Sequence, residues 1–392
     1  MTPPKLSRRR LLAAGAALAL PAFAQQPAAT PAATPARRIP KLTLAGPFAT
    51  VSYPLIRMAE SGALADVAEQ VEFVSWKSPD QLRAMAVNKS ADFLAMPSNV
   101  PANLYNKGVP LKLLSITIWG ILWVLTRDAN IKRIEDLKGQ ELTMHFKGDM
   151  PDCTFRLLAQ KAGMDPDKDV KLRYVATPME AMQLLLMRRT DNALLAEPAV
   201  SMGLRKSGSF PVSIIAPELH RGIDIQAEWG RLLGRAPRIP QAGIAMLGGQ
   251  LGNAALIERF QQAHAEAIQW CKAHPEECGK MVVKHIDTLT PEAVADAMRV
   301  DKAELVSASQ ARPELEFFYQ QLAQMQPGLI GGKLPDDAFY YQPPAAASPS
   351  ARPWGMSSTG SPTPCRCHRP MPERAVSHPG HPGLRPRVHE TP

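Results

Sequence analysis

The sequence has 392 residues, a formal net charge of +9 and 45% hydrophobic residues. The excess positive charge lies near the ends: residues 1–24 contribute four charges, Arg37 and Arg38 two, and residues 343–392 a net four. Residues 39–342 are therefore almost neutral, which argues against a basic nucleic-acid-binding surface. These roughly 300 residues are enough for two lobes of ordinary domain size.

The N-terminus has the anatomy of a signal peptide, predicted over residues 1–24. Basic residues at 5 and 8–10 precede ten apolar residues at 11–20, and a small-x-small tripeptide follows at 22–24. Residues 7–12 fit the twin-arginine pattern, although the general secretory route stays open. A membrane anchor is the alternative, but it needs about 20 apolar residues. We therefore expect export and cleavage near Ala24.

We also expect the exported protein to carry no lipid anchor. No cysteine precedes Cys153, so no lipid-modified cysteine is expected to follow the signal. Residues 25–39 are rich in Ala, Pro and Thr and read as a flexible leader. We expect a periplasmic, monomeric protein without a lipid anchor.

Short apolar segments then alternate with helical segments. Strands are expected at residues 41–44, 71–75, 93–96, 111–118, 121–126, 142–145, 171–175, 193–196, 212–215 and 243–247. Helices are expected after Ser78 and Thr177, because each hydroxyl precedes a Pro and, at the third position, a Gln or Glu. A later helix places apolar residues between Leu256 and Trp270 on one face. This alternation predicts an α/β protein with largely parallel sheets.

Four loops at strand ends suggest a ligand site. In open α/β sheets, ligands bind beyond the carboxyl ends of strands, where loops lead into helix N-termini. The loops at residues 44–48, 96–99, 146–151 and 196–198 have this character, although turn chemistry explains each one taken singly. The candidate ligand-binding residues are Gly46, Pro47, Phe48, Ser98, Asn99, Trp119, Gly148, Asp149 and Glu197.

Several of these residues have structural alternatives. Ser98 and Asn99 also suit the N-cap of a helix. Phe48, Trp76 and Trp119 can stack on a planar ligand or fill the core.

Glu197 ends an apolar strand, so its carboxylate needs either a ligand amine or an internal Arg partner. If Glu197 faces the ligand, a cation or an amino-bearing heterocycle is favoured over an anion. His145 and Lys147 flank the Gly148 loop and suit either an anion or the solvated surface.

These residues resemble the nitrate/sulfonate/taurine-type substrate-binding proteins of ABC transporters, which share a fold with the thiamine-pyrimidine precursor binders. The resemblance covers residues 40–340 and is carried by the segments 45–47, 92–99, 134–139, 148–149 and 191–198. It implies a type II periplasmic binding fold, with two α/β lobes joined by a double-crossover hinge. The expected boundaries are 40–127 with 240–342 for the first lobe and 128–239 for the second.

The resemblance also implies a function. A small ligand, which is a sulfonate, nitrate or an amino-bearing heterocycle, would be enclosed between the lobes and passed to an ABC permease. No cofactor is expected. The alternatives are a periplasmic sensor subunit and a thiamine-pyrimidine-synthase-like enzyme, but the sequence shows no concentrated set of catalytic groups, and we expect no enzyme.

The cysteines and the tail complete the expectations. Cys271 and Cys278 flank a helix boundary, and a disulfide between them is plausible in an oxidising compartment. Cys153 has no evident base nearby and is expected to be structural. Residues 343–392 contain twelve Pro and are expected to be disordered. The abrupt change in composition after residue 342 suggests that the tail is a frameshifted read-through. Within the tail, Cys365, Cys367 and His368 make a poor zinc motif.

Overall fold

The computed structural model describes residues 38–215 and 218–343, which all belong to one unit of the chain. The predicted signal peptide and nearly all of the predicted leader lie outside the described residues. The same holds for the predicted tail from residue 344 onward, with its cysteines and histidines.

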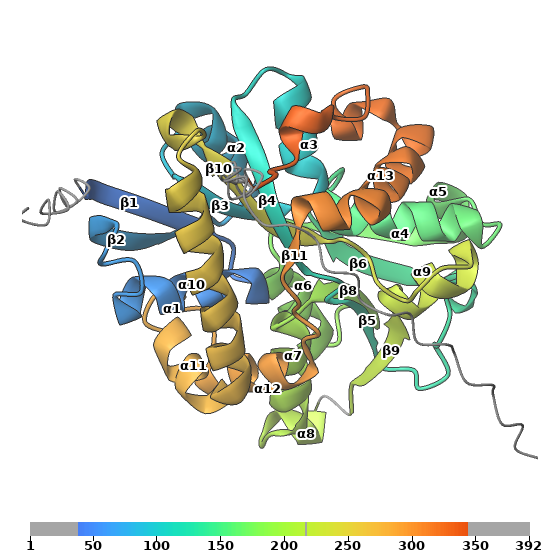
Figure 1. The fold of residues 1–392 in the computed structure, drawn as a ribbon. Helices are drawn as coiled ribbons and strands as arrows, with labels where there is room; N and C mark the ends of the chain where they lie inside the picture. Colours follow the sequence, from blue (N-terminus) through green and yellow to red (C-terminus); the bar gives the residue numbers. More distant parts are fainter. Residues whose placement is uncertain (1–37, 216–217, 344–392) are drawn as a thin grey trace, which may run out of the picture. The chain divides into compact units, whose positions relative to one another are not determined.

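The first sheet has six strands in the order β11-β4-β10-β3-β1-β2 (Figure 1). Strand β1 pairs in parallel with β2 and β3, whereas β10 runs antiparallel to β3 and β4, and β11 runs antiparallel to β4. The bounds are β1 Ile39–Gly46, β2 Ala68–Ser75, β3 Phe93–Pro97, β4 Leu111–Ile118, β10 Ala242–Leu247 and β11 Val306–Ser307.

The second sheet has five strands in the order β7-β6-β8-β5-β9. Strand β6 pairs in parallel with β7 and β8, whereas β5 runs antiparallel to β8 and β9. The bounds are β5 Leu122–Thr126, β6 Glu141–His145, β7 Lys171–Val175, β8 Asn192–Ala196 and β9 His220–Asp224.

Helices cover both sheets. Two predicted N-caps are present: Ser78 Oγ accepts a hydrogen bond from the Gln81 N–H at 3.2 Å, and Thr177 Oγ1 accepts one from the Glu180 N–H at 3.1 Å. The longer helices are α1 Tyr53–Ser61, α2 Pro79–Asn88, α3 Asn99–Asn106, α4 Met150–Lys161, α6 Pro178–Leu186, α7 Ala199–Gly208, α9 Ile225–Leu233, α10 Ala254–Ala273, α11 Pro275–Val282, α12 Pro291–Val300 and α13 Ala308–Met325. The short ones are α5 Pro166–Asp169, α8 Val212–Ile215, and the 3-10 helices η1 Thr50–Ser52, η2 Ile134–Leu137, η3 Gly248–Gln250, η4 Pro327–Ile330 and η5 Asp337–Phe339.

The predicted α/β class is confirmed, and nine of the ten predicted strands are present. The prediction of largely parallel sheets is wrong, because each sheet combines a parallel part with antiparallel strands. Strands β5 and β10 each enter their sheet directly from the other sheet. They therefore lack the βα connection within one sheet that makes neighbouring strands parallel.

The predicted strand at residues 212–215 is also wrong, since these residues form the short helix α8. An apolar run becomes a strand only where a neighbouring strand pairs with it. The edge of the second sheet is occupied instead by β9, whose residues 220–222, His-Arg-Gly, carry little strand propensity.

Two chain crossings connect the sheets. The first runs through residues 119–121 between β4 and β5, and the second through residues 235–241 between α9 and β10. Strand β5 therefore belongs to the second sheet, although the predicted first lobe extended to residue 127. At the first crossing Gly120 has a φ of 126°, and a Cβ there would collide with the side chain of Gln226.

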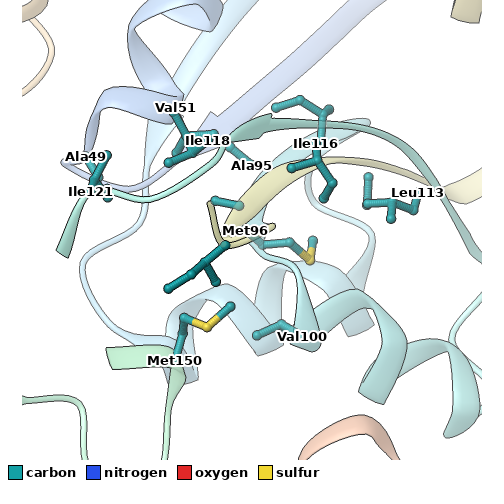
Figure 2. Packing of buried hydrophobic residues seen from close by; sticks show 14 of the residues in the cluster. Ala49, Val51, Ala95, Met96, Val100, Leu113, Ile116, Ile118, Ile121 and Met150 are labelled. Carbon is teal, nitrogen blue, oxygen red and sulfur yellow. The ribbon is translucent and has the colours of Figure 1, made fainter. Parts of the chain in front are cut away.

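The buried apolar side chains form two clusters. The larger one includes residues of both sheets and their helices. Figure 2 shows Met96 and Val100, from β3 and α3, together with Met150 from α4. The second cluster joins α1, α11 and α12 to α6, α7 and β8, and α12 packs on α7. The two sheets therefore meet through continuous apolar packing.

One buried carboxylate is only partly compensated. Both carboxylate oxygens of Asp301, at the end of α12, are buried, and the Thr50 hydroxyl and the Ala303 N–H lie near them without a well-formed hydrogen bond. Burial raises the pKa of Asp301 to about 6, although Thr50, Lys272 and the Ala303 backbone oppose this rise. Ionised Asp301 therefore destabilises the folded state.

The free energy of unfolding is therefore expected to fall as the pH rises and Asp301 ionises. Because the folded-state pKa lies above the unfolded value, the protonated carboxyl stabilises the fold at low pH, and this contribution is lost as the pH rises through about 6. We expect Asp301→Asn to increase the free energy of unfolding by about 2–3 kcal/mol at pH 8 and to have little effect at pH 4.

Urea unfolding at the two pH values measures this effect, with the exposed Asp287→Asn as the matched control. An equal effect of Asp301→Asn at both pH values would contradict the prediction.

Candidate functional site

A cleft lies between the two sheets, and residues of both sheets line it. The space between its walls is about 690 Å³, including the part open to solvent. The first sheet and its helices contribute Pro47, Phe48, Ala49, Val51, Trp76, Pro79, Leu82, Met96, Pro97 and Val100. The second sheet and its helices contribute Leu122, His145, Phe146, Asp149, Met150, Pro151 and Ala196, and the crossings and β10 contribute Ile121, Gln241 and Ala242.

The turn after β1 brings Pro47 and Phe48 to the cleft. A Cβ at Gly46 would collide with the Ser52 hydroxyl, which donates a hydrogen bond to the Pro47 carbonyl at 2.5 Å. Gly46 therefore does not line the cleft, but its missing side chain lets Ser52 hold the turn in place.

The indole of Trp76 also lines the cleft from the first sheet. Its Nε1 donates a hydrogen bond to the carbonyl of Ala95 at 3.0 Å, and the side chain is buried. Because its single donor is already used, Trp76 offers the cleft only apolar ring surface.

His145 and Phe146 line the cleft from the end of β6. Successive residues of a strand point to opposite faces, but Phe146 has a left-handed φ of 56°, which turns the chain so that both side chains reach the cleft. The two rings lie edge to face at 4.7 Å. A left-handed non-glycine residue is uncommon and points to a constraint on this turn.

The imidazole of His145 is 2% exposed. Burial lowers its pKa to about 4, against a smaller opposite effect of its hydrogen bond to the backbone of Leu194, so the ring is neutral at pH 7. Its Nδ1 is buried and has no hydrogen-bond partner among the described residues.

Gln241 supplies a second polar group, from the second crossing. Its Oε1 accepts a hydrogen bond from the Ile121 N–H at 3.0 Å, which identifies the other end of the carboxamide as the nitrogen. No residue among 38–215 and 218–343 accepts a hydrogen bond from that nitrogen.

Asp149 closes one side of the cleft. Its Oδ1 accepts from Arg83 Nη2 at 2.5 Å, so this cross-cleft ion pair joins α2 of the first sheet to the loop before α4 of the second. Burial raises the pKa of Asp149, and Arg83 counteracts this rise. The pair therefore links the two walls and neutralises the charge that lies nearest the cleft.

Comparison with known proteins gives a consistent picture of the fold. No family model and no curated protein matches the chain. An ABC transporter structure from Parabacteroides distasonis is 22% identical with a TM-score of 0.62, covering 77% of this chain and 98% of that chain. The periplasmic aliphatic sulphonate binding protein SsuA from Escherichia coli is 14% identical with a TM-score of 0.58, covering 82% and 98%.

The periplasmic nitrate-binding protein NrtA from Synechocystis PCC 6803 is 16% identical with a TM-score of 0.57, covering 74% of this chain and 82% of that chain. The chain has the two-lobed periplasmic binding protein fold. The fold that the sequence resemblance implied is thus confirmed, and the two sheets with their helices are its lobes.

Of the candidate residues, Pro47, Phe48 and Asp149 line the cleft, whereas others have structural partners outside it. The Ser98 hydroxyl donates to the Pro240 carbonyl at 2.5 Å, and Asn99 Nδ2 lies 3.5 Å from the Leu329 carbonyl. Neither side chain caps α3.

Trp119 and Gly148 are not among the residues that line the cleft. Trp119 Nε1 donates to the Glu304 carbonyl at 3.0 Å, and the Arg238 guanidinium covers the indole ring at 3.6 Å. Gly148 has a φ of 77° and donates its N–H to Asp152. Lys147 is exposed and lies over the Tyr174 ring.

Glu197 has an internal Arg partner, which was one of the two predicted roles beside contact with a ligand amine. It is 1% exposed, its Oε1 accepts from Arg221 at 2.5 Å, and its Oε2 accepts from the Ser201 N–H at 3.1 Å. Its neighbour Ala196, not Glu197, lines the cleft. The carboxylate is therefore satisfied by the second lobe itself.

Gln241 was not predicted at all, and Phe146 was predicted only as part of the loop at residues 146–151, not as a lining residue. Gln241 lies in a crossing whose path depends on the arrangement of both sheets, so no local pattern marks it. The left-handed turn at Phe146 also has no sequence signal, since glycine is the residue expected there.

The three described cysteines are free and buried. Cys271 and Cys278 are hydrogen-bonded to each other, and this contact, together with burial, raises the pKa of the Cys271 thiol. The predicted disulfide is therefore not formed in this structure.

The described residues show neither a metal-binding cluster nor a membrane-spanning helix. Within 38–215 and 218–343, no cluster of three or more His, Cys, Asp or Glu suits a metal ion. In the same ranges no helix is both long and apolar enough to cross a bilayer. The groups that line the cleft suit non-covalent binding of a small molecule.

The cross-cleft ion pair predicts a change in lobe closure. Arg83→Ala leaves Asp149 without its partner and removes one contact between the lobes. We expect the closed form of the ligand-free protein to become about 3- to 10-fold less populated, because a partly buried pair contributes on the order of 1 kcal/mol.

A larger radius of gyration in small-angle X-ray scattering checks this expectation. Lys168→Ala is the control, since Lys168 pairs with Asp165 inside one lobe. An unchanged radius for Arg83→Ala would show that the pair does not hold the lobes together.

Glu197 generates a second prediction. Glu197→Gln keeps the shape but removes the charge that pairs with Arg221, so we expect the free energy of unfolding to fall by about 3 kcal/mol. Ligand affinity, measured on the folded protein, is expected to stay unchanged. A loss of affinity without a loss of stability would assign Glu197 to the ligand instead.

Proposed function

We propose that this protein is a periplasmic solute-binding protein that captures a small molecule between its lobes and delivers it to an ABC permease. The cleft carries this proposal: both lobes line it, and the two crossings meet at it. The likeness to binding components of ABC transporters supports the same role.

The proposed mechanism is closure around the ligand. A solute that touches Phe48 and Trp76 of the first lobe and His145 and Phe146 of the second binds the closed form more tightly than the open form. The difference in affinity shifts the population toward the closed form, which the permease would recognise. No covalent step is required, and we propose a binding protein rather than an enzyme.

The proposed ligand-binding residues combine sequence and structure. Pro47, Phe48 and Asp149 were candidates from the sequence and also line the cleft. Trp76 and His145 are added because they line the cleft. Ser98, which donates to the Pro240 carbonyl, and Gly46 are proposed to position this site rather than to touch the solute.

Export supports the same function. The signal-peptide pattern in residues 7–24 is consistent with the periplasm, where such binding proteins meet their solutes. We propose that the exported protein acts as a monomer with one ligand in its cleft.

The proposal predicts a bound solute whose retention depends on Phe48. Native mass spectrometry of the full chain, after incubation with a bacterial metabolite extract, is expected to show one small molecule per chain. Phe48→Ala removes an aromatic wall that faces the cleft, so the affinity for that molecule should fall at least about 10-fold.

Phe210→Ala is the matched control, because Phe210 is 81% exposed and lies outside the cleft lining. Absence of any retained molecule, or an equal effect of both variants, would argue against solute capture in this cleft.

A further inference from the structure

The loop between β6 and α4 carries several second-lobe residues that face the first lobe. Phe146 and Asp149 line the cleft, and Asp149 forms the cross-cleft ion pair with Arg83. Met150, which follows directly, belongs to the same apolar cluster as Met96 of the first lobe (Figure 2). The conformation of this loop therefore bears directly on contact between the lobes.

The loop contains a turn with an unfavourable backbone conformation. Phe146 has a left-handed φ of 56° and Gly148 one of 77°, and a 3.0 Å hydrogen bond from the Asp149 N–H to the Phe146 carbonyl closes the turn. A left-handed conformation at a bulky residue costs free energy and persists only where neighbouring groups hold it. Such groups are present next to the turn.

Asp152, in the first turn of α4, binds this turn from the protein side. It is 2% exposed, and its Oδ2 accepts a hydrogen bond from the Gly148 N–H at 2.7 Å. Its Oδ1 accepts two more, from Arg156 Nε at 2.8 Å and from the Tyr174 hydroxyl at 2.9 Å. A carboxylate with three donors is fixed in place, and it fixes the Gly148 N–H with it.

Arg156 and Tyr174 connect this carboxylate to the rest of the second lobe. Arg156 Nη2 donates to the Tyr174 hydroxyl at 2.9 Å, and Arg156 Nη1 donates to Asp167 at 2.8 Å. Tyr174 lies in β7, and its ring centroid lies 5.1 Å from the ammonium of Lys147, the neighbour of Gly148. The turn is thus held at two successive residues by one network from α4 and β7.

We propose that Asp152, held by Arg156 and Tyr174, is a positioning residue: it holds the turn at residues 146–149 so that Asp149 faces Arg83, and thereby sets how readily the lobes close. The positioning role rests on the proposed function, since closure is the step by which the protein would capture its solute. Asp152 is not among the residues that line the cleft, so it acts through the turn and not through the ligand.

Small-angle X-ray scattering of the full, ligand-free chain tests this role. In Asp152→Ala the Gly148 N–H loses its acceptor, and we expect the closed form to become about 3- to 10-fold less populated, with a larger radius of gyration. Asp167→Ala is the matched control, because Asp167 binds the same Arg156 guanidinium but has no hydrogen bond to the turn among the described residues. The control is expected to keep the radius of the unaltered chain, and an equal effect of both variants would overturn the proposal.

Combination with Arg83→Ala shows whether Asp152 acts through the cross-cleft ion pair. If it does, the two single variants and the double variant have closed populations that agree within about 2-fold, because the second substitution removes a contact that is already lost. Independent effects would instead multiply to about 10- to 100-fold and would overturn the proposal.

Urea unfolding of the same variants separates positioning from helix capping. A lower free energy of unfolding for Asp152→Ala with an unchanged radius of gyration would make Asp152 an ordinary cap of α4 and overturn the proposal. If Asp152→Ala fails to fold, Tyr174→Phe decides instead, since it removes one donor to Asp152 and leaves the bond to Gly148. We expect its closed form to be about 2- to 5-fold less populated, and an unchanged radius would again overturn the proposal.

Closure and solute capture are measured separately. If the unaltered chain retains a solute in native mass spectrometry and Asp152→Ala closes as readily as that chain, only the positioning role fails. If no solute is retained, the proposed function fails, and the scattering measurement still decides the role of Asp152.

Discussion

The two chain crossings are the constraint on which the cleft depends. Gln241 donates its backbone N–H to the Ile118 carbonyl and Ile239 donates to the Trp119 carbonyl, each at 3.0 Å, so the outgoing and returning segments are bonded to each other. The Gln241 side chain adds a third bond, to Ile121. The crossings therefore form one short ladder, which can serve as the axis of a hinge rotation between the lobes.

Two carboxylates beside the cleft have partners within the protein. Glu197 pairs with Arg221 inside the second lobe, and Asp149 pairs with Arg83 across the lobes. What remains facing the cleft is neutral: the imidazole of His145 and the carboxamide of Gln241, among aromatic and aliphatic side chains.

The fold was largely predictable because its signals are local. The apolar runs of β4 and β7 match their predicted bounds, and Ser78 and Thr177 cap the expected helices, because hydroxyl caps act over three residues of sequence. The strand predicted at residues 212–215 was wrong because pairing decides whether an apolar run becomes a strand. The direction of β5 and β10 was missed for a similar reason, since it depends on which sheet the chain comes from.

By itself, the sequence determined the α/β class, most of the strands and the strand-end loops that contain Phe48 and Asp149, because propensity and capping act between near neighbours. Only the tertiary structure decided which side chains meet in the cleft. It gave Trp119 and Glu197 partners at Glu304 and Arg221, and it placed Gln241 and Phe146 in the lining of the cleft. The physical reason is that the role of a buried polar group depends on the group with which it forms a hydrogen bond, and residues distant in the sequence supply that group.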